Sequence, residues 1–160
     1  MSSAMEKKTG GCLCGGVRYE TWGEPIDAIF LLTPPRSICH CPWCKKLSGA
    51  VYASQIVVHK DNYRITQGDP KYFSLKHQGD SYGNWFCETC GSAVGRDASP
   101  FPDIRVIKLG TLDNLEDVNW AKPRREIYTS ARVSWVPTFE GCIQIPGLAT
   151  EAGLGGEKEK

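Results

Sequence analysis

Residues 39–49 read Cys39-His40-Cys41-Pro42-Trp43-Cys44-Lys45-Lys46-Leu47-Ser48-Gly49, with three cysteines within six positions. Thiols this close together are typical of a site for a soft divalent metal ion and are a poor way to fill a hydrophobic core. A closed tetrahedral site needs four ligands. Either another part of the chain supplies the fourth ligand, or one coordination position is open for chemistry.

Two further cysteine pairs lie on either side of this stretch. Cys12 and Cys14 have two glycines before and two after them, which give the backbone the freedom to bend both thiols toward one metal. Cys87-Glu88-Thr89-Cys90-Gly91 has the form of a zinc knuckle, in which the glycine permits a left-handed turn. The eighth cysteine, Cys142, stands apart, and we expect it to be a free, partly buried thiol.

The spacing allows more than one assignment of these thiols to metal sites. The two pairs can form one closed four-thiolate site and leave the triple cluster as a three-thiolate site. Spacing alone also permits two cysteines of the triple cluster to join Cys12 and Cys14. We expect zinc, because it is redox-inert and suits tetrahedral sulfur, although iron can also occupy a four-thiolate site.

Composition is that of one ordinary globular domain, with 160 residues, 23% of them charged, and a formal net charge of +1. This charge gives no reason to expect binding to nucleic acid or to an anionic membrane. No apolar run is long enough for a membrane span and Met1–Lys8 does not resemble a signal peptide, so we expect a cytoplasmic protein. Cysteines there are metal ligands or reactive thiols more often than disulfides, and a secreted four-disulfide protein is the alternative.

The fold class follows from short apolar runs that are separated by glycine and proline. These runs predict a mainly β domain of antiparallel strands, with short helical turns at 42–47, 60–63 and around 113–117. We expect one domain over residues 10–149, with disordered ends at 1–9 and 150–160. The expected strands are 17–21, 28–32, 51–58, 63–66, 71–75, 82–86, 93–96, 104–109 and 125–128.

Four motifs in this order resemble those of a known family. They are Gly11-Cys12-Leu13-Cys14-Gly15-Gly16-Val17-Arg18-Tyr19, the stretch 39–49, Phe86-Cys87-Glu88-Thr89-Cys90-Gly91-Ser92 and Gly110-Thr111-Leu112-Asp113. On these motifs the chain is similar, over about residues 10–135, to the glutathione-dependent formaldehyde-activating enzyme and centromere protein V family.

The resemblance implies an Mss4-like fold of antiparallel sheets with two zinc sites. It implies a structural zinc on the two outer pairs, Cys12, Cys14, Cys87 and Cys90, and a catalytic zinc on Cys39, Cys41 and Cys44. The implied activity is the reversible addition of glutathione to formaldehyde, a carbon-sulfur lyase reaction that gives S-(hydroxymethyl)glutathione. Asn84-Trp85 stand where many members carry a basic residue, which leaves the thiol substrate open.

A mechanism can be proposed from the donor set. Three thiolates leave a Zn²⁺ centre with a net charge of about −1, so its bound water is a poorer acid than at a site of neutral ligands. We expect such a site to capture the substrate thiol as a thiolate, which then attacks formaldehyde. Two alternatives are a non-enzymatic zinc module that binds a protein partner and a zinc or thiol buffer.

For several other residues we prefer an interpretation that gives them no role at the metal site or in substrate binding. His40 is expected to be structural or solvent-facing, because adjacent residues seldom bind one metal. Lys45, Lys46 and Arg36 are expected to be solvated cations that make no substrate contact. Trp43, Trp85 and Trp135 are expected to pack in the core of the β domain and not to line a pocket.

Overall fold

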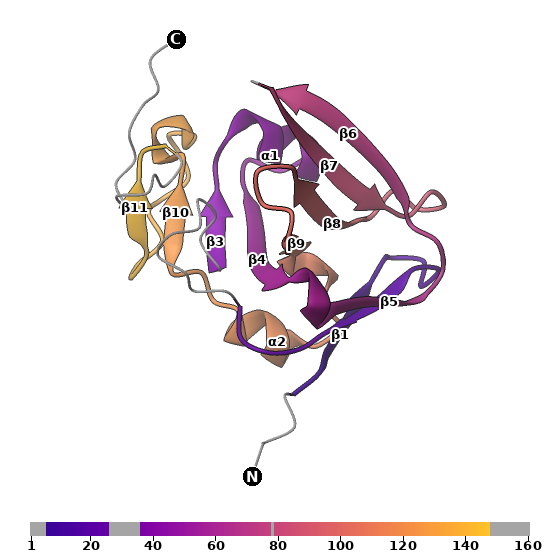
Figure 1. The fold of residues 1–160 in the computed structure, drawn as a ribbon. Coiled ribbons are helices and arrows are strands. Elements are labelled where there is room, and N and C mark those ends of the chain that lie inside the picture. Colours follow the sequence, from indigo (N-terminus) through magenta and orange to yellow (C-terminus); the bar gives the residue numbers. More distant parts are fainter. Residues whose placement is uncertain (1–5, 26–35, 78, 148–160) are drawn as a thin grey trace.

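The computed structural model describes residues 6–25, 36–77 and 79–147, which form two β-sheets with short helices between the strands (Figure 1). The expected strand at 28–32 and the expected disordered tail at 150–160 lie outside the described residues. The strands are β1 (Lys8–Gly11), β2 (Arg18–Thr21), β3 (Arg36–Cys39), β4 (Ala53–His59), β5 (Tyr63–Gln67), β6 (Lys71–His77), β7 (Asp80–Phe86), β8 (Ala93–Ala98), β9 (Ile104–Lys108), β10 (Arg125–Ile127) and β11 (Ile143–Ile145).

The larger sheet has eight strands in the order β11-β10-β3-β4-β9-β8-β7-β6, and the smaller sheet has three in the order β1-β2-β5. The mainly β class is therefore confirmed, but the purely antiparallel expectation is wrong at one edge. β10 pairs parallel to both β3 and β11, whereas all other pairs are antiparallel. The long connections that precede β10 and β11 can cross over between strands, which a two-residue hairpin cannot do.

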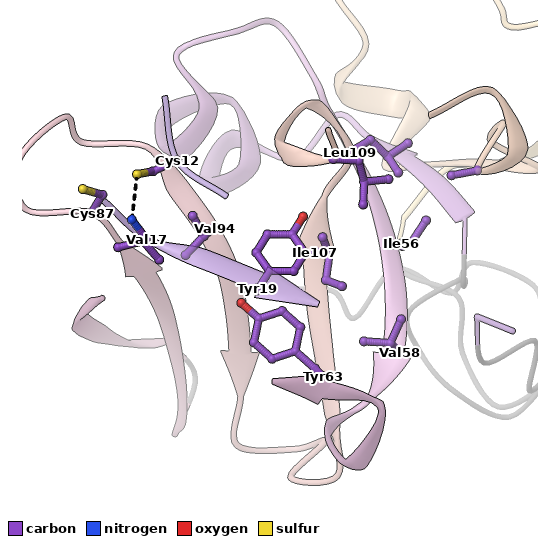
Figure 2. Packing of buried hydrophobic residues seen from close by; sticks show 12 residues of the cluster. Cys12, Val17, Tyr19, Ile56, Val58, Tyr63, Cys87, Val94, Ile107 and Leu109 are labelled. Atoms are coloured by element: carbon purple, nitrogen blue, oxygen red, sulfur yellow. Dashed lines mark hydrogen bonds between the residues drawn. The ribbon is translucent and has the colours of Figure 1, made fainter. Parts of the chain in front are cut away.

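Both faces of β4 are buried, because one packs in the main core and the other in a smaller apolar cluster. Ile56 and Val58 alternate with Gln55 and Val57 and face the smaller sheet. There they pack in the main core with Tyr19 from β2 (Figure 2). Gln55 and Val57 point to the opposite face, and this second face carries the candidate site.

The main core lies between the two sheets and includes aromatic rings from the smaller one. Tyr19 and Tyr63 stack with ring centroids 5.1 Å apart, and Figure 2 shows them beside Val94 and Ile107. Cys12 and Cys87 lie at one end of the same core. One candidate metal ligand from each outer pair therefore packs in the core that joins the two sheets.

Three helical segments agree with the predicted turns. The helix α1 (Pro42–Ser48) has residues that favour helix ends: Pro42 is at its first position, and Gly49 caps its C-terminus with φ of 66°. The Cys41 Sγ atom caps the other end by accepting a hydrogen bond from the Cys44 N–H at 3.3 Å. The short 3-10 helix η1 (Lys60–Asn62) and the helix α2 (Leu115–Trp120) occupy the other two predicted positions. Two more 3-10 turns are η2 (Leu109–Thr111) and η3 (Thr129–Ala131).

Three strands escaped prediction because their sequences lack a strand pattern. β1 contains two glycines and includes Lys8 and Thr9, which we assigned to the disordered N-terminus. β1 forms because all of its residues pair with residues of β2. β3 and β11 have four and three residues and likewise depend on their neighbours in the sheet.

In the described part of the chain, no helix has both the length and the apolar character that crossing a membrane requires.

Candidate metal centre and active site

The four cysteines of the two outer pairs come together at one end of the core. The Sγ atoms of Cys12, Cys14, Cys87 and Cys90 all lie within 4.8 Å of one another. Cys12 and Cys14 approach to 3.5 Å, and Cys14 and Cys87 to 3.7 Å. The edge of a tetrahedron of sulfurs around zinc is about 3.8 Å when each Zn–S bond is about 2.3 Å. This cluster could therefore hold a metal ion without rearrangement.

Two tight turns with the same design present these thiols. Gly15 donates its N–H to the Cys12 carbonyl at 3.1 Å, and Gly91 donates to the Cys87 carbonyl at 2.8 Å. Both glycines have positive φ, 77° and 75°, which a residue with a side chain rarely adopts. The left-handed turn predicted at Gly91 is confirmed.

Ser92 connects the two turns and was missed from the sequence. Its hydroxyl accepts a hydrogen bond from the Leu13 N–H at 3.0 Å and lies 3.3 Å from the Cys90 Sγ atom. Hydrogen bonds from the Ser92 side chain and backbone lower the pKa of Cys90 to about 5. Ser92 thus favours the thiolate form, which a metal ligand requires.

The triple cluster is separate from the four-cysteine cluster. Cys39 is the last residue of β3, Cys41 caps α1 and Cys44 lies in its first turn, and their Sγ atoms lie within 4.8 Å of one another. Cys39 and Cys44 are buried, and Cys41 is partly exposed. The structure thus groups the seven cysteines as four and three, and it brings none of the triple cluster to Cys12 and Cys14.

Electrostatics at the triple cluster favour a bound cation. Hydrogen bonds from Cys39 and Cys41 lower the pKa of Cys44, and the positive charges of Lys108 and Arg96 lower it further. The pKa of Cys39 is raised, first by its contacts with Cys41 and Cys44 and then by burial. Thiolates this close repel one another, so the cluster can ionise fully only when a metal cation offsets the charge. The three-thiol donor set therefore fits a soft divalent metal with an open coordination position.

Two protein cations accompany the cluster. Arg96 donates from Nη1 to the Cys44 Sγ atom at 3.4 Å. Lys108 is 9% exposed, and its Nζ atom has no hydrogen-bond partner among the described residues. Burial lowers the pKa of Lys108, and the charge of Cys44 opposes that effect.

A cavity of about 310 Å³ opens beside the triple cluster on the second face of the larger sheet. Strands of this sheet contribute one wall, and α1 contributes Pro42, Trp43 and Cys44. Its lining is mainly apolar and includes Cys39, Cys41, Pro42, Trp43, Cys44, Gln55, His77, Tyr82, Arg96, Ala98, Phe101, Ile104, Val106, Ile127 and Tyr128. The three thiols therefore share a pocket large enough for a small ligand.

Tyr128 lines this cavity with a backbone conformation that is unusual for its residue type. Its φ is 55°, and it is the only non-glycine residue with positive φ in the described ranges. Its N–H donates to the Gly147 carbonyl at 2.9 Å, which holds this conformation. Such backbone costs about 1–3 kcal/mol and is concentrated at functional sites. Burial, with the nearby cysteines, raises the pKa of Tyr128 to about 12, so its hydroxyl keeps its proton at neutral pH.

His40 has a structural role, as preferred from the sequence, but it is not solvent-facing. It is fully buried, and its Nε2 atom lies 2.9 Å from the Glu126 Oε2 atom. A carboxylate can only accept hydrogen bonds, so His40 carries its proton on Nε2. The His40 N–H also donates to the Ile127 carbonyl at 3.1 Å, so this residue ties the cysteine stretch to β10.

The tryptophan prediction is correct for one residue and wrong for two. Trp85 packs against the main core and donates to Asp97 at 3.0 Å. Trp43 instead lines the cavity, where its ring centroid lies 5.3 Å from that of His77 and 6.2 Å from that of Tyr82. Trp135 is 72% exposed and is therefore not a core residue.

The remaining residues named from the sequence lie away from the cavity. Lys45 donates to the Ala131 carbonyl, Lys46 is exposed, and Arg36 pairs with Glu24 at 3.0 Å. Cys142 belongs to neither cluster and its thiol contacts the Pro123 carbonyl at 3.3 Å. It is partly buried, as predicted.

Comparison with known proteins shows a similar fold and the family of the chain. A solved structure of a Rhodobacter sphaeroides protein is similar in fold, with a TM-score of 0.50 and 20% sequence identity, over 69% of this chain and 94% of that chain. The family model described as glutathione-dependent formaldehyde-activating enzyme matches residues 7–131, which include both cysteine clusters. The match spans well over half of the 160 residues, so the chain belongs to the glutathione-dependent formaldehyde-activating enzyme family.

Proposed function

We propose that the protein is a zinc-dependent carbon-sulfur lyase that reversibly adds glutathione, or a similar thiol, to formaldehyde or a related small electrophile. The observation that carries this proposal is the opening of the three-cysteine cluster into a cavity, whereas the four-cysteine cluster lies at the end of the core. A structural metal needs four ligands and no cavity. We therefore assign the catalytic role to Cys39, Cys41 and Cys44, and the structural role to Cys12, Cys14, Cys87 and Cys90.

We also propose an Mss4-like assignment for the fold, a single domain over residues 10–149 and a cytoplasmic location. The two cysteine clusters carried by a mainly β domain support the fold assignment. The cysteines of both clusters are free thiols, which agrees with a reducing compartment.

The chain's own residues can prepare a thiol for addition. A zinc ion held by the three cysteines would supply positive charge that favours the thiolate form of a substrate thiol. Arg96, which lies against Cys44, and the buried Lys108 add two positive charges beside the cluster. The mainly apolar cavity wall excludes water and strengthens these interactions.

We assign Tyr128 the role of hydrogen-bond or proton donor to the oxygen of the carbonyl substrate. During addition the sulfur bonds to the carbonyl carbon, the C=O double bond becomes a single bond, and the oxygen receives a proton. The phenol of Tyr128 lines the cavity and remains protonated at neutral pH, so it can donate a hydrogen bond or a proton to that oxygen.

Tyr128→Phe is expected to lower kcat about 100-fold and to change KM little, because it removes one donor to the developing negative charge. The measurement is steady-state kinetics of hemithioacetal formation, with thermal unfolding to verify the fold. Tyr72→Phe is the matched control, since Tyr72 is 45% exposed on β6 and outside the cavity. Equal kcat values for Tyr128→Phe and the native protein would show that Tyr128 takes no part in the reaction.

The function itself is tested by exchange spectroscopy on an equilibrium mixture of glutathione and formaldehyde. We expect the zinc-loaded protein to accelerate exchange. Cys41→Ser is expected to reduce this acceleration by more than the ~10–100-fold that follows loss of an outer-shell partner. Serine is a good helix N-cap, so the hydroxyl can replace the Cys41 cap of α1 and the variant should stay folded.

Cys142→Ser is the matched control for that experiment, because Cys142 belongs to neither cluster. It should retain full acceleration. Native acceleration in Cys41→Ser would contradict the proposed function, as would a zinc-loaded native protein that accelerates exchange neither with formaldehyde nor with another aldehyde.

A further inference from the structure

The cavity beside the triple cluster has far more apolar surface than formaldehyde can cover. Four aromatic side chains line it: Trp43, Tyr82, Phe101 and Tyr128. The rings of Trp43 and Tyr82 lie 6.2 Å apart at an interplanar angle of 54°, and they come from α1 and β7. Formaldehyde has one carbon and no apolar group to place among these rings.

The far wall of the cavity continues into a small apolar cluster. Ile104 and Val106 of β9 line the cavity, and both pack with Val57 of β4. Phe101, from the connection between β8 and β9, packs against the same cluster. A ligand whose sulfur lies at the thiols can therefore extend a flat apolar group toward this wall.

The charges of the cavity do not match the rest of glutathione. Arg96 is the only arginine or lysine among the described residues that line it. Its guanidinium is already engaged, since it contacts the Cys44 sulfur at 3.4 Å and lies 5.4 Å from the Tyr82 ring centroid. Glutathione carries two carboxylates, and burying either without a partner would be costly. The polar arms of the thiol therefore belong outside the cavity, which leaves its apolar volume for the other reactant.

We infer that the carbonyl substrate is a flat apolar aldehyde, aryl or conjugated, whose ring occupies this cavity while its carbonyl carbon meets the substrate sulfur. This inference rests on the proposed function and names its second substrate. The reaction is an addition: the S–H bond breaks, a C–S bond forms, and the C=O double bond becomes a C–O single bond. The proton ends on the oxygen, nothing is oxidised or reduced, and the product is the hemithioacetal of that aldehyde.

Two unreactive thioethers test occupancy of the cavity without any turnover. S-benzylglutathione and S-methylglutathione differ only in the apolar group on sulfur. Isothermal titration calorimetry should show that the native protein binds the benzyl compound at least about tenfold more tightly, because even one methylene in a fitted pocket is worth about tenfold or more.

Ala98→Phe is designed to fill the cavity. Ala98 lines it at the end of β8, opposite Tyr82 in the neighbouring strand, and is only partly buried, so that a phenyl group can be accommodated. We expect this variant to abolish the tenfold preference for the benzyl compound. Ala50→Phe is the matched control, because Ala50 is exposed and outside the cavity. It should keep the preference.

Turnover separates failure of this inference from failure of the proposed function. Exchange between glutathione and its aldehyde adduct is measured with benzaldehyde and with formaldehyde. We expect greater acceleration over the uncatalysed rate with benzaldehyde, and loss of that preference in Ala98→Phe. Acceleration with formaldehyde, with equal affinity for the two thioethers, would overturn only the choice of aldehyde. Acceleration with neither aldehyde would overturn the proposed function and this inference together.

Discussion

Cys87→Ser is expected to leave the protein unfolded at 25 °C. Cys87 is 3% exposed and packs in the main core, and it shares a cluster with Cys12 and Cys14 of the distant N-terminal turn. Metal in such a site contributes about 10–16 kcal/mol of apparent binding free energy, which is comparable to the ~5–15 kcal/mol total stability of a domain. Serine is a poor replacement for a zinc thiolate, so most of this contribution would be lost.

Circular dichroism and metal analysis of the purified variant provide the measurement. Cys142→Ser is the control for replacing a cysteine as such, and it should retain native spectra and full metal content. Cys41→Ser is the control for the other cluster, and it should stay folded and lose only the metal of that site. A cooperative unfolding transition at the native temperature in Cys87→Ser would contradict the structural assignment of this cluster.

Glu126→Gln is expected to destabilise the protein by about 3–5 kcal/mol, because it breaks a buried ion pair and leaves its partner charge unmatched. The Glu126 side chain is fully buried and accepts from Arg132 Nη2 at 2.9 Å, from Gln144 Nε2 at 2.8 Å and from the Phe139 N–H at 2.7 Å. It also pairs with His40, which lies between two cysteines of the triple cluster. The carboxylate therefore joins β10 to the segment that carries the thiols.

The same contacts give the protein an acid-sensitive stability. Burial alone would raise the pKa of Glu126, but the hydrogen bonds from Gln144, His40, Phe139 and Arg132 outweigh it and lower the pKa below 4.5. A lowered pKa means that the stabilisation is fully present above the pKa of the unfolded chain, about 4.5, and is lost as the pH falls through the folded-state value. The loss should begin below pH 4.5.

Urea unfolding at pH 7 and at several values between pH 5 and pH 3 measures both effects. Glu126→Gln should be less stable at pH 7, and its stability should fall less steeply with acid than that of the native protein. Glu116→Gln is the matched control, because Glu116 is exposed on α2. A native free energy of unfolding in Glu126→Gln at pH 7 would show that the buried carboxylate is not needed.

Local signals were enough to predict much of the fold. The strands β4, β5, β7 and β9 appear where short apolar runs predicted them, because each run is longer than a turn and bounded by polar or glycine residues. α1 was also predictable from local sequence, because Pro42 and Gly49 mark its two ends. β3 and β11 were not, because these short segments form strands only by pairing with neighbours in the sheet, β3 with β4 and β10, and β11 with β10.

The cysteine spacing by itself determined which thiols form pairs, since C-x-C and C-x-x-C place two sulfurs on one turn whatever the rest of the fold. Only the tertiary structure decided which pairs share a site, because it brings the turn at Cys12 to the turn at Cys87 across the core. The cavity likewise depends on the whole fold. Tyr82, Arg96 and Ile104 come from three strands, and sheet register and face decide that they meet beside the cysteines. Contacts between residues close in the chain can be predicted from the sequence, whereas contacts across a sheet depend on how the strands pair.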